Sequence, residues 1–266
     1  MAKEKRSRQT AANADKHLLY QESVQCPEAE VAFFNKVFRK KRGRKPMSMR
    51  EDFCGTAFLS TEWCTSHPER TAVGIDLDEP TLDWGRQNVL SKVGTDVSDR
   101  VSLHRADVLA GLGPNVDITC AMNFSYFIFK QRQQLIEYFK VARRGLKEDG
   151  LFFCELYGGT EAIVDLKEKR EFKGFDYVWH QSKFNPITRE TLCHIHFEFP
   201  DGSRLKRAFT YDWRLWTIPE VRECMAEAGF SRTEVWWEDI ENDGKYRETS
   251  REENQEGWLV YVIAER

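Results

Sequence analysis

The residues from Met49 to Ser60, Met-Arg-Glu-Asp-Phe-Cys-Gly-Thr-Ala-Phe-Leu-Ser, constrain the fold of this chain more than any other segment. A short strand is predicted to end near Glu51, a tight turn of small residues follows over 54–57, and an apolar segment, 58–63, begins a helix. A strand, turn and helix in this order let the backbone approach a ligand and leave N–H groups free at the helix start. Only one glycine, Gly55, stands in the turn, so the segment alone indicates nucleotide binding weakly.

Two acidic residues downstream strengthen this interpretation. A second strand is predicted over 71–75 and is followed by Asp76, which comes 21 residues after Gly55. That spacing is close to the ~20 residues at which a carboxylate meets ribose hydroxyls in doubly wound folds. Asp107 follows a third strand, 101–105. Either acid alone is more often a cap or turn residue, but two acids after successive strands lie where doubly wound sheets bind ligands.

Length and composition exclude several classes of protein. The chain has 266 residues, of which 41% are hydrophobic and 31% are charged, as in an ordinary globular domain. The formal net charge of −3 does not favour general nucleic-acid binding. The seven cysteines are scattered without a C-x-x-C pair, so we expect neither disulfides nor a zinc site, and a reducing cytoplasm fits best. No apolar run approaches the ~18 residues of a membrane span, and the N-terminus lacks the pattern of a signal peptide.

Helices and strands are predicted to alternate through the first part of the chain. Further strands are expected over 116–122 and 151–156, and helices over 27–38, 79–90 and 131–146. Strands separated by helices of this length imply βαβ units and a parallel sheet.

The pattern changes after the fifth strand. Three strand-like runs, 175–183, 190–199 and 203–213, follow, and the last two are joined by a Pro-Asp-Gly-Ser turn. A helix with a capping box at Thr217 and two last strands, 235–237 and 258–264, complete the chain.

The sequence therefore predicts an α/β fold with a doubly wound, mostly parallel, seven-stranded Rossmann-like sheet and an antiparallel β insertion after the fifth strand. We expect residues 1–45 to form a helical arm or lid with a basic end, and residues 46–266 to form the main domain. The insertion, 160–216, interrupts this domain and is expected to act as a substrate lid.

The order of these motifs resembles a class I S-adenosylmethionine-dependent methyltransferase over residues 49–264. Within that family the chain is similar to a bacterial subgroup with Asp-Phe-Cys-Gly-Thr-Ala in the cofactor loop. The family usually reads acid-x-Gly-x-Gly-x-Gly after the first strand. Here the register is Glu51, Phe53, Gly55 and Ala57, so two of the three glycines are replaced.

The resemblance implies S-adenosyl-L-methionine as the cofactor. Asp76 would bind the ribose hydroxyls and Leu77 the adenine face, while Asp107 and the Val108 N–H would hold the adenine edge. Glu51 would face the methionine end. The full set of implied cofactor-binding residues is Glu51, Phe53, Cys54, Gly55, Asp76, Leu77, Asp107, Val108 and Asn123.

Asn123 and Tyr126 follow the fourth strand, where the family approaches the transferring methyl group. Their spacing is similar to the Asn-Pro-Pro-Tyr of amino-group methyltransferases, although both prolines are missing. The resemblance implies catalytic roles, in which the amide and a backbone carbonyl aim the acceptor by positioning it. The alternative is that both residues only line the cofactor pocket.

A competing signal lies in the insertion. His194, His196 and Glu198 alternate along one strand and could meet one metal ion, or they could form its polar outer face. No further ligand spacing supports a metal, so none is expected. His180, His194 or His196 remains open as a general base.

The leading functional hypothesis is methyl transfer to a small molecule, through nitrogen or oxygen. A basic run over 36–45 motivates the alternative of an RNA or protein substrate. Such runs are more often a solvated helix end followed by a linker, so we favour that interpretation and do not expect nucleic acid as a partner. A non-catalytic cofactor-binding regulator is the third possibility. The sequence leaves both a monomer and a homodimer open.

Overall fold

The computed structural model describes residues 9–239 and 245–266, and the chain forms two compact units. The core unit comprises Cys26–Gly159 and Trp216–Arg266, and the insertion unit comprises Met1–Gln25 and Thr160–Leu215. In the described part of the chain, no helix has the length and apolar character that a membrane span requires.

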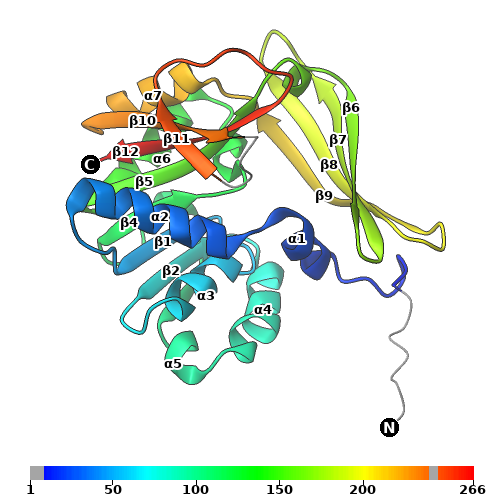
Figure 1. The fold of residues 1–266 in the computed structure, drawn as a ribbon, viewed down its shortest axis with the longest axis horizontal. Helices are drawn as coiled ribbons and strands as arrows, with labels where there is room; N and C mark the ends of the chain where they lie inside the picture. Colours follow the sequence, from blue (N-terminus) through cyan, green and yellow to red (C-terminus); the bar gives the residue numbers. More distant parts are fainter. Residues whose placement is uncertain (1–8, 240–244) are drawn as a thin grey trace. The chain divides into compact units, whose positions relative to one another are not determined.

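An eight-stranded sheet with the order β11-β10-β12-β5-β4-β1-β2-β3 organises the core unit (Figure 1). The pairs from β3 to β5 are parallel, whereas β12, β10 and β11 are antiparallel to their neighbours. The strands are β1 (Ser48–Asp52), β2 (Thr71–Asp76), β3 (Val101–Arg105), β4 (Val116–Ala121), β5 (Leu146–Gly158), β10 (Arg232–Asp239), β11 (Lys245–Thr249) and β12 (Trp258–Glu265).

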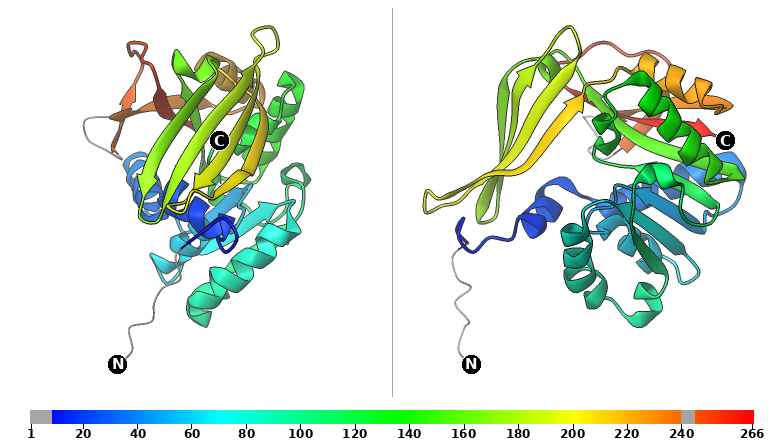
Figure 2. Two further views of the ribbon diagram at one scale, coloured as in Figure 1. Left: turned by 90° about the vertical axis from the view of Figure 1, so that its right-hand side faces the viewer. Right: turned by 180° about the vertical axis from the view of Figure 1, so that it is seen from behind.

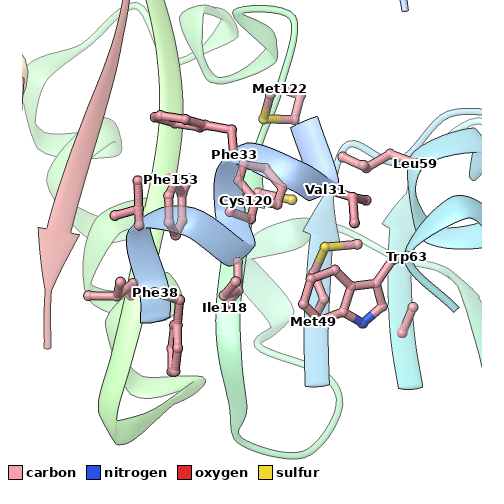
Figure 3. Close-up of a cluster of buried hydrophobic side chains, with 14 of the residues drawn as sticks. Val31, Phe33, Phe38, Met49, Leu59, Trp63, Ile118, Cys120, Met122 and Phe153 are labelled. Atoms are coloured by element: carbon pink, nitrogen blue, oxygen red, sulfur yellow. The ribbon is translucent and has the colours of Figure 1, made fainter. Parts of the chain in front are cut away.

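Helices cover both faces of this sheet because its central strands are apolar on both sides. Adjacent residues of β5 show this directly: Phe153 packs against Phe34 of α2, and Phe152 packs against Phe139 of α6. Figure 3 shows the face of the sheet that α2 covers, where apolar side chains of α2 and α3 pack against those of β1, β4 and β5. The core-unit helices are α2 (Pro27–Arg42), α3 (Phe58–Thr65), α4 (Glu79–Asn88), α5 (Thr95–Ser98), α6 (Arg132–Arg144) and α7 (Ile218–Glu227).

The insertion unit is a four-stranded antiparallel sheet with one helix (Figure 2). Its strands follow in chain order, β6 (Leu166–Phe172), β7 (Phe175–Phe184), β8 (Glu190–Glu198) and β9 (Arg204–Arg214). One face carries a buried cluster that includes Leu19 of α1 (Lys16–Val24), Phe175, Ile195 and Phe197. The other face of β8 carries His194, His196 and Glu198, as strand alternation requires.

The predicted fold class is confirmed, with corrections to the strands. The core sheet has eight strands rather than seven because β11 adds an antiparallel edge. The insertion has four strands rather than three because β6 was missed. Both missed strands are polar and mostly exposed edge strands, so neither shows the apolar alternation that identifies a half-buried strand.

The boundary between helix α6 and strand β5 lies earlier in the chain than the sequence predicted. The helix was expected to reach residue 146, but α6 ends at Arg144 and β5 begins at Leu146, which pairs with Val116. A register shift follows, after which Leu151 pairs with Ile118. The expected strand 151–156 is therefore the central part of a longer, bulged strand.

The N-terminal segment is divided between the two units. Helix α1 belongs to the insertion unit, and α2 packs within the core unit. The expected substrate-lid role of the insertion stays a prediction.

Candidate functional site

The loop after β1 has the backbone of a glycine-rich turn without most of the glycines. Phe53, Gly55 and Ala57 have φ angles of 60°, 53° and 58°. Phe53 and Ala57 stand where the family pattern has glycine, and a left-handed non-glycine residue costs roughly 1–2 kcal/mol. The Phe53 ring offsets part of this cost by packing at 5.8 Å from Tyr138 and 6.1 Å from Phe129, centroid to centroid. The turn thus keeps its shape through packing.

Strand β2 holds this loop in place through a hydrogen bond and close packing. Cys54 N–H donates to the Ile75 carbonyl at 3.0 Å, and Cys54 is buried. A Cβ atom at Gly74 would lie 2.8 Å from Cys54 Sγ, so only glycine allows this approach. Burial also raises the pKa of the Cys54 thiol well above its usual value, which favours a structural role over a reactive one.

Asp76 connects the end of β2 to the same loop. Its Oδ2 accepts from Gly55 N–H at 2.8 Å, and its Oδ1 accepts from Asp78 N–H at 2.9 Å. Each oxygen therefore has a fixed orientation and further lone pairs for a ligand's hydroxyls. Leu77 beside it is 63% exposed, an unusual environment for a large apolar side chain next to a fixed carboxylate.

Asp107 and Val108 lie at the next strand end. Asp107 Oδ1 accepts from Leu109 N–H at 2.9 Å and begins the 3₁₀ helix Val108–Ala110. The Val108 carbonyl accepts from Arg50 Nη2 at 3.0 Å. Arg50 and its partner Asp52 are fully buried on β1 and were not recognised as site residues from the sequence, because nothing in a short strand indicates that two charges in it are buried.

Three carboxyl groups carry the clearest electrostatic signal of the core unit. Burial raises the pKa of Glu51 to about 7, although two hydrogen bonds from Ser60 oppose the shift. Burial also raises the pKa of Glu155 to about 7, opposed by hydrogen bonds from Asn123 N–H and the Tyr261 side chain. The pKa of Glu30, half-buried on α2, is also raised, first by burial and then by Glu155 and Glu51. Within residues 9–239 and 245–266, none of the three glutamates has an ion-pair partner.

Glu30 and Glu155 were missed from the sequence. An acid inside the apolar strand Phe-Phe-Cys-Glu-Leu was the available signal for Glu155. Buried acids that lack a cation are expensive unless they are protonated or bind one. This group is therefore suited to a cationic ligand.

The segment after β4 is strained at its start. Asn123 and Phe124 have φ angles of 53° and 58°, values that favour glycine. Asn123 N–H donates to Glu155 Oε2 at 2.6 Å, and its side-chain amide has no hydrogen-bond partner among the residues with described structure. Tyr126 is fully buried, and its hydroxyl donates to the Glu155 carbonyl at 3.0 Å. Asn123 thus offers a free amide, whereas Tyr126 supports the strand end.

The basic run is largely engaged within the core unit. Lys41 pairs with Glu234 at 2.5 Å and Glu265 at 3.1 Å, and Arg42 pairs with Glu265 at 2.6 Å. Arg44 Nη2 lies 2.8 Å from Asp117, which is fully buried. Lys41 and Arg42 thus tie the end of α2 to the sheet and do not form the solvated helix end that was expected.

No group of three or more histidine, cysteine or acidic residues in the described ranges could hold a metal ion. The cysteines of these ranges are all free.

Comparison of the whole fold finds many similar solved structures. A S-adenosylmethionine-dependent methyltransferase from Clostridium acetobutylicum has a TM-score of 0.70 at 12% identity, covering 94% of this chain and 96% of its own. The sugar N-methyltransferase KedS8 from Streptoalloteichus has a TM-score of 0.64 at 17% identity, covering 95% and 93%. S-adenosylmethionine-bound CalS10, an amino pentose methyltransferase from Micromonospora echinaspora, has a TM-score of 0.66 at 15% identity, covering 94% and 96%.

A scan against models of known protein families finds no match. A search of curated proteins finds none either. At these identities the structural likeness establishes the fold, which is that of S-adenosylmethionine-dependent methyltransferases.

Proposed function

We propose that the protein transfers a methyl group from S-adenosyl-L-methionine to a small-molecule acceptor, through nitrogen or oxygen. The observation that carries the proposal is a group of three neighbouring glutamates, of which Glu51 and Glu155 are buried and Glu30 is half-buried. S-adenosylmethionine bears a sulfonium and an ammonium group, and it would supply the cation that these carboxyls lack. When bound, it supplies an electrophilic methyl group.

The residues divide between the two ends of the cofactor. Glu51 and its neighbours Phe53, Cys54 and Gly55 would hold the methionine end. Asp76 would accept from both ribose hydroxyls through oxygens that the backbone already orients. Beside it, Leu77 would cover the adenine, which accounts for its exposure in the free protein. Asp107 and Val108 N–H would bind the adenine edge.

Asn123 would aim the acceptor. Its side-chain oxygen can accept a hydrogen bond from an amine or hydroxyl and so direct the lone pair at the methyl group. Tyr126 would act as a positioning residue, because its buried hydroxyl holds the Glu155 carbonyl and thereby the end of β5. Acceptors of the neighbours named above, an amino pentose among them, support nitrogen as the acceptor atom.

Calorimetry tests cofactor binding, and labelled methyl donor tests transfer. We expect S-adenosylmethionine to bind the wild type and to bind Glu51→Gln at least about tenfold more weakly, a loss of roughly 1.4 kcal/mol. Incubation of the enzyme with isotopically labelled donor and a pool of small amines and alcohols should then yield labelled product. Absence of cofactor binding to folded protein would contradict the proposal, and binding without transfer to any acceptor would favour a regulator.

A further inference from the structure

A row of polar side chains crosses the whole insertion sheet on one face. Lys167 on β6 pairs with His180 on β7, His180 with His194 on β8, and His194 with Thr210 on β9. Directly paired residues project from the same face. His196 lies beside this row, with its ring centroid 5.6 Å from that of His180 and 5.9 Å from that of His194. Three imidazoles and a lysine are therefore neighbours in space.

Hydrogen bonds determine which ring nitrogen carries the proton in His196 and in His180. Arg207 N–H donates to His196 Nδ1 at 3.0 Å, so the neutral ring has its proton on Nε2. That Nε2 lies 3.4 Å from His180 Nδ1, which must accept. The proton of His180 is then on Nε2, 3.6 Å from Asp165. Because His196 Nε2 bears a proton, it has no lone pair for a metal ion, and the cluster is unsuited to a cation.

Strand β9 has a bulge next to the histidines, and the bulged segment contains the cationic residue Arg207. The β8–β9 register shifts between Ile195 and Phe197, and Arg207 in the bulge has a φ of 52°. A left-handed arginine is strained, and bulges of this kind re-aim a side chain, often at functional sites.

The same face is hollowed and bears excess positive charge. The hollow has a volume of about 520 Å³ and is lined by Lys167, Val178, His180, His196, Glu198, Arg204, Lys206 and Arg207. Its one carboxylate, Glu198, is already compensated by Arg204 and Lys169, each at 3.1 Å. Lys167, Lys206 and Arg207 have no ion-pair partner anywhere in the described part of the chain.

The positive charge around the hollow affects the pKa values of the three histidines. The pKa values of His180, His194 and His196 are all lowered, first by burial. Arg207 lowers all three pKa values further, His180 lowers those of His194 and His196, and Lys167 lowers those of His180 and His196. Asp165 opposes the shift at His180 alone. An anion in the hollow would offset this repulsion and allow an imidazole to take up a proton.

We propose that this hollow binds a small molecule through a phosphate group, with Lys167 and Arg207 as the primary ligands and His180 and His196 as proton-dependent ones. A guanidinium and an ammonium are the groups that most often bind phosphate in proteins, and arginine can do so with two parallel hydrogen bonds. The site lies wholly within the insertion unit. It does not depend on the proposed methyl transfer.

Titration calorimetry of the full chain with inorganic phosphate, pyrophosphate and glucose 6-phosphate tests the site and separates free phosphate from a phosphate ester. We expect binding of at least one probe, and a loss of about tenfold or more in the variant Lys167→Gln with Arg207→Gln. Arg170→Gln is the matched control, because Arg170 is on the same strand but on the other face, over the Tyr177 ring at 4.5 Å. It should change affinity less than about twofold. Circular dichroism confirms that each variant is folded.

Sulfate tests the role of the histidines, because it stays divalent throughout the relevant pH range. We expect sulfate to bind several-fold more tightly near pH 6 than near pH 8, and His180→Gln with His196→Gln to remove most of that difference. Three outcomes would overturn the proposal: no binding of any probe at millimolar concentration, an equal loss of affinity in Arg170→Gln, or sulfate affinity that is the same at both pH values.

Discussion

Arg50 and Asp52 form a fully buried ion pair within a single strand, with 2.7 Å between Nε and Oδ1. Two residues apart on β1, they project from the same face. Tyr138 of α6 donates to Asp52 Oδ2 at 3.0 Å, and Arg50 Nη2 reaches the Val108 carbonyl. The pair therefore ties the first strand to the loop in which Val108 is proposed to bind adenine.

The first prediction concerns the stability that this pair provides. Asp52→Asn should lower the free energy of unfolding by about 3–5 kcal/mol, because it leaves the Arg50 charge buried without a counter-ion. Arg50→Met with Asp52→Leu should cost less than the single change, since no charge is then left unpaired. Urea denaturation measures both, and Arg86→Met, which breaks an exposed pair with Glu79, is the control at under about 1 kcal/mol. A double variant that loses at least as much stability as Asp52→Asn would contradict coupling.

The second prediction concerns Asp76. Asp76→Ala should weaken S-adenosylhomocysteine binding by roughly 2–4 kcal/mol, because it removes two charge-assisted bonds to the ribose and the support of Gly55 N–H. Asp78→Ala is the matched control: it removes the N-cap of α4 and should lower stability by about 1 kcal/mol without a comparable loss of affinity. Equal losses of affinity in both variants would show that loop stability, and not ribose binding, explains the effect.

The third prediction concerns pH. A carboxyl whose folded pKa is raised from 4.5 to about 7, as at Glu51, makes the folded state bind more protons between those values. Its contribution to stability is present below about pH 4.5 and is lost as the pH rises through about 7. The free energy of unfolding of the unliganded protein should therefore fall from about pH 5 to about pH 8, and Glu51→Gln should reduce that fall by on the order of 1–3 kcal/mol.

Ligand binding should have the opposite dependence on pH. A cationic ligand favours the ionised carboxyls, so S-adenosylmethionine should bind more tightly at about pH 8 than at about pH 6 and should release protons on binding at the lower pH. Calorimetry in buffers of different ionisation enthalpy measures that release. Glu223→Gln, an exposed change on α7, should alter neither dependence. Affinity that is insensitive to pH in the wild type would remove the glutamates from the proposed cofactor site.

The parts of the fold that were predicted correctly depend on interactions between residues close together in the sequence. The apolar run of β4 and the capping box at Thr217 act within a few residues, so their pattern is visible in the chain itself. The turn between β1 and α3 was predicted for the same reason, since small residues after a strand are a local signal. Strand β6 was missed because its residues between Leu166 and Phe172 are charged, and only pairing with β7 makes them a strand.

The electrostatics of the site could not be predicted in this way. Glu30 and Glu155 are far apart in sequence, and each is unremarkable until the sheet and α2 bring them together. Similarly, Arg44 looked like part of a solvated basic run, yet it pairs with Asp117, whose pKa falls to about 2 through bonds from Arg44, Lys147 and the backbone, which outweigh burial. Burial of a charge is decided by tertiary contacts, which a single sequence does not display.

The last prediction concerns Asn123 as the residue that aims the acceptor. Asn123→Ala should lower kcat by about 10²-fold or more, because loss of a positioning hydrogen bond misdirects the attacking lone pair. Affinity for S-adenosylmethionine should stay within about tenfold, roughly 1.4 kcal/mol, since the backbone N–H that holds Glu155 remains. Initial rates and calorimetry on the same preparation separate the two quantities.

Two further variants distinguish aiming from strain in the β4 turn. Asn123→Asp keeps the shape of the side chain and an acceptor oxygen, so it should retain more activity than alanine. Asn123→Gly relaxes the φ of 53° but removes the amide, so it should be as stable as the wild type or more stable, yet as slow as alanine. If Asn123→Gly turned over at the wild-type rate, the backbone conformation alone would suffice, and the acceptor would be aimed by another group.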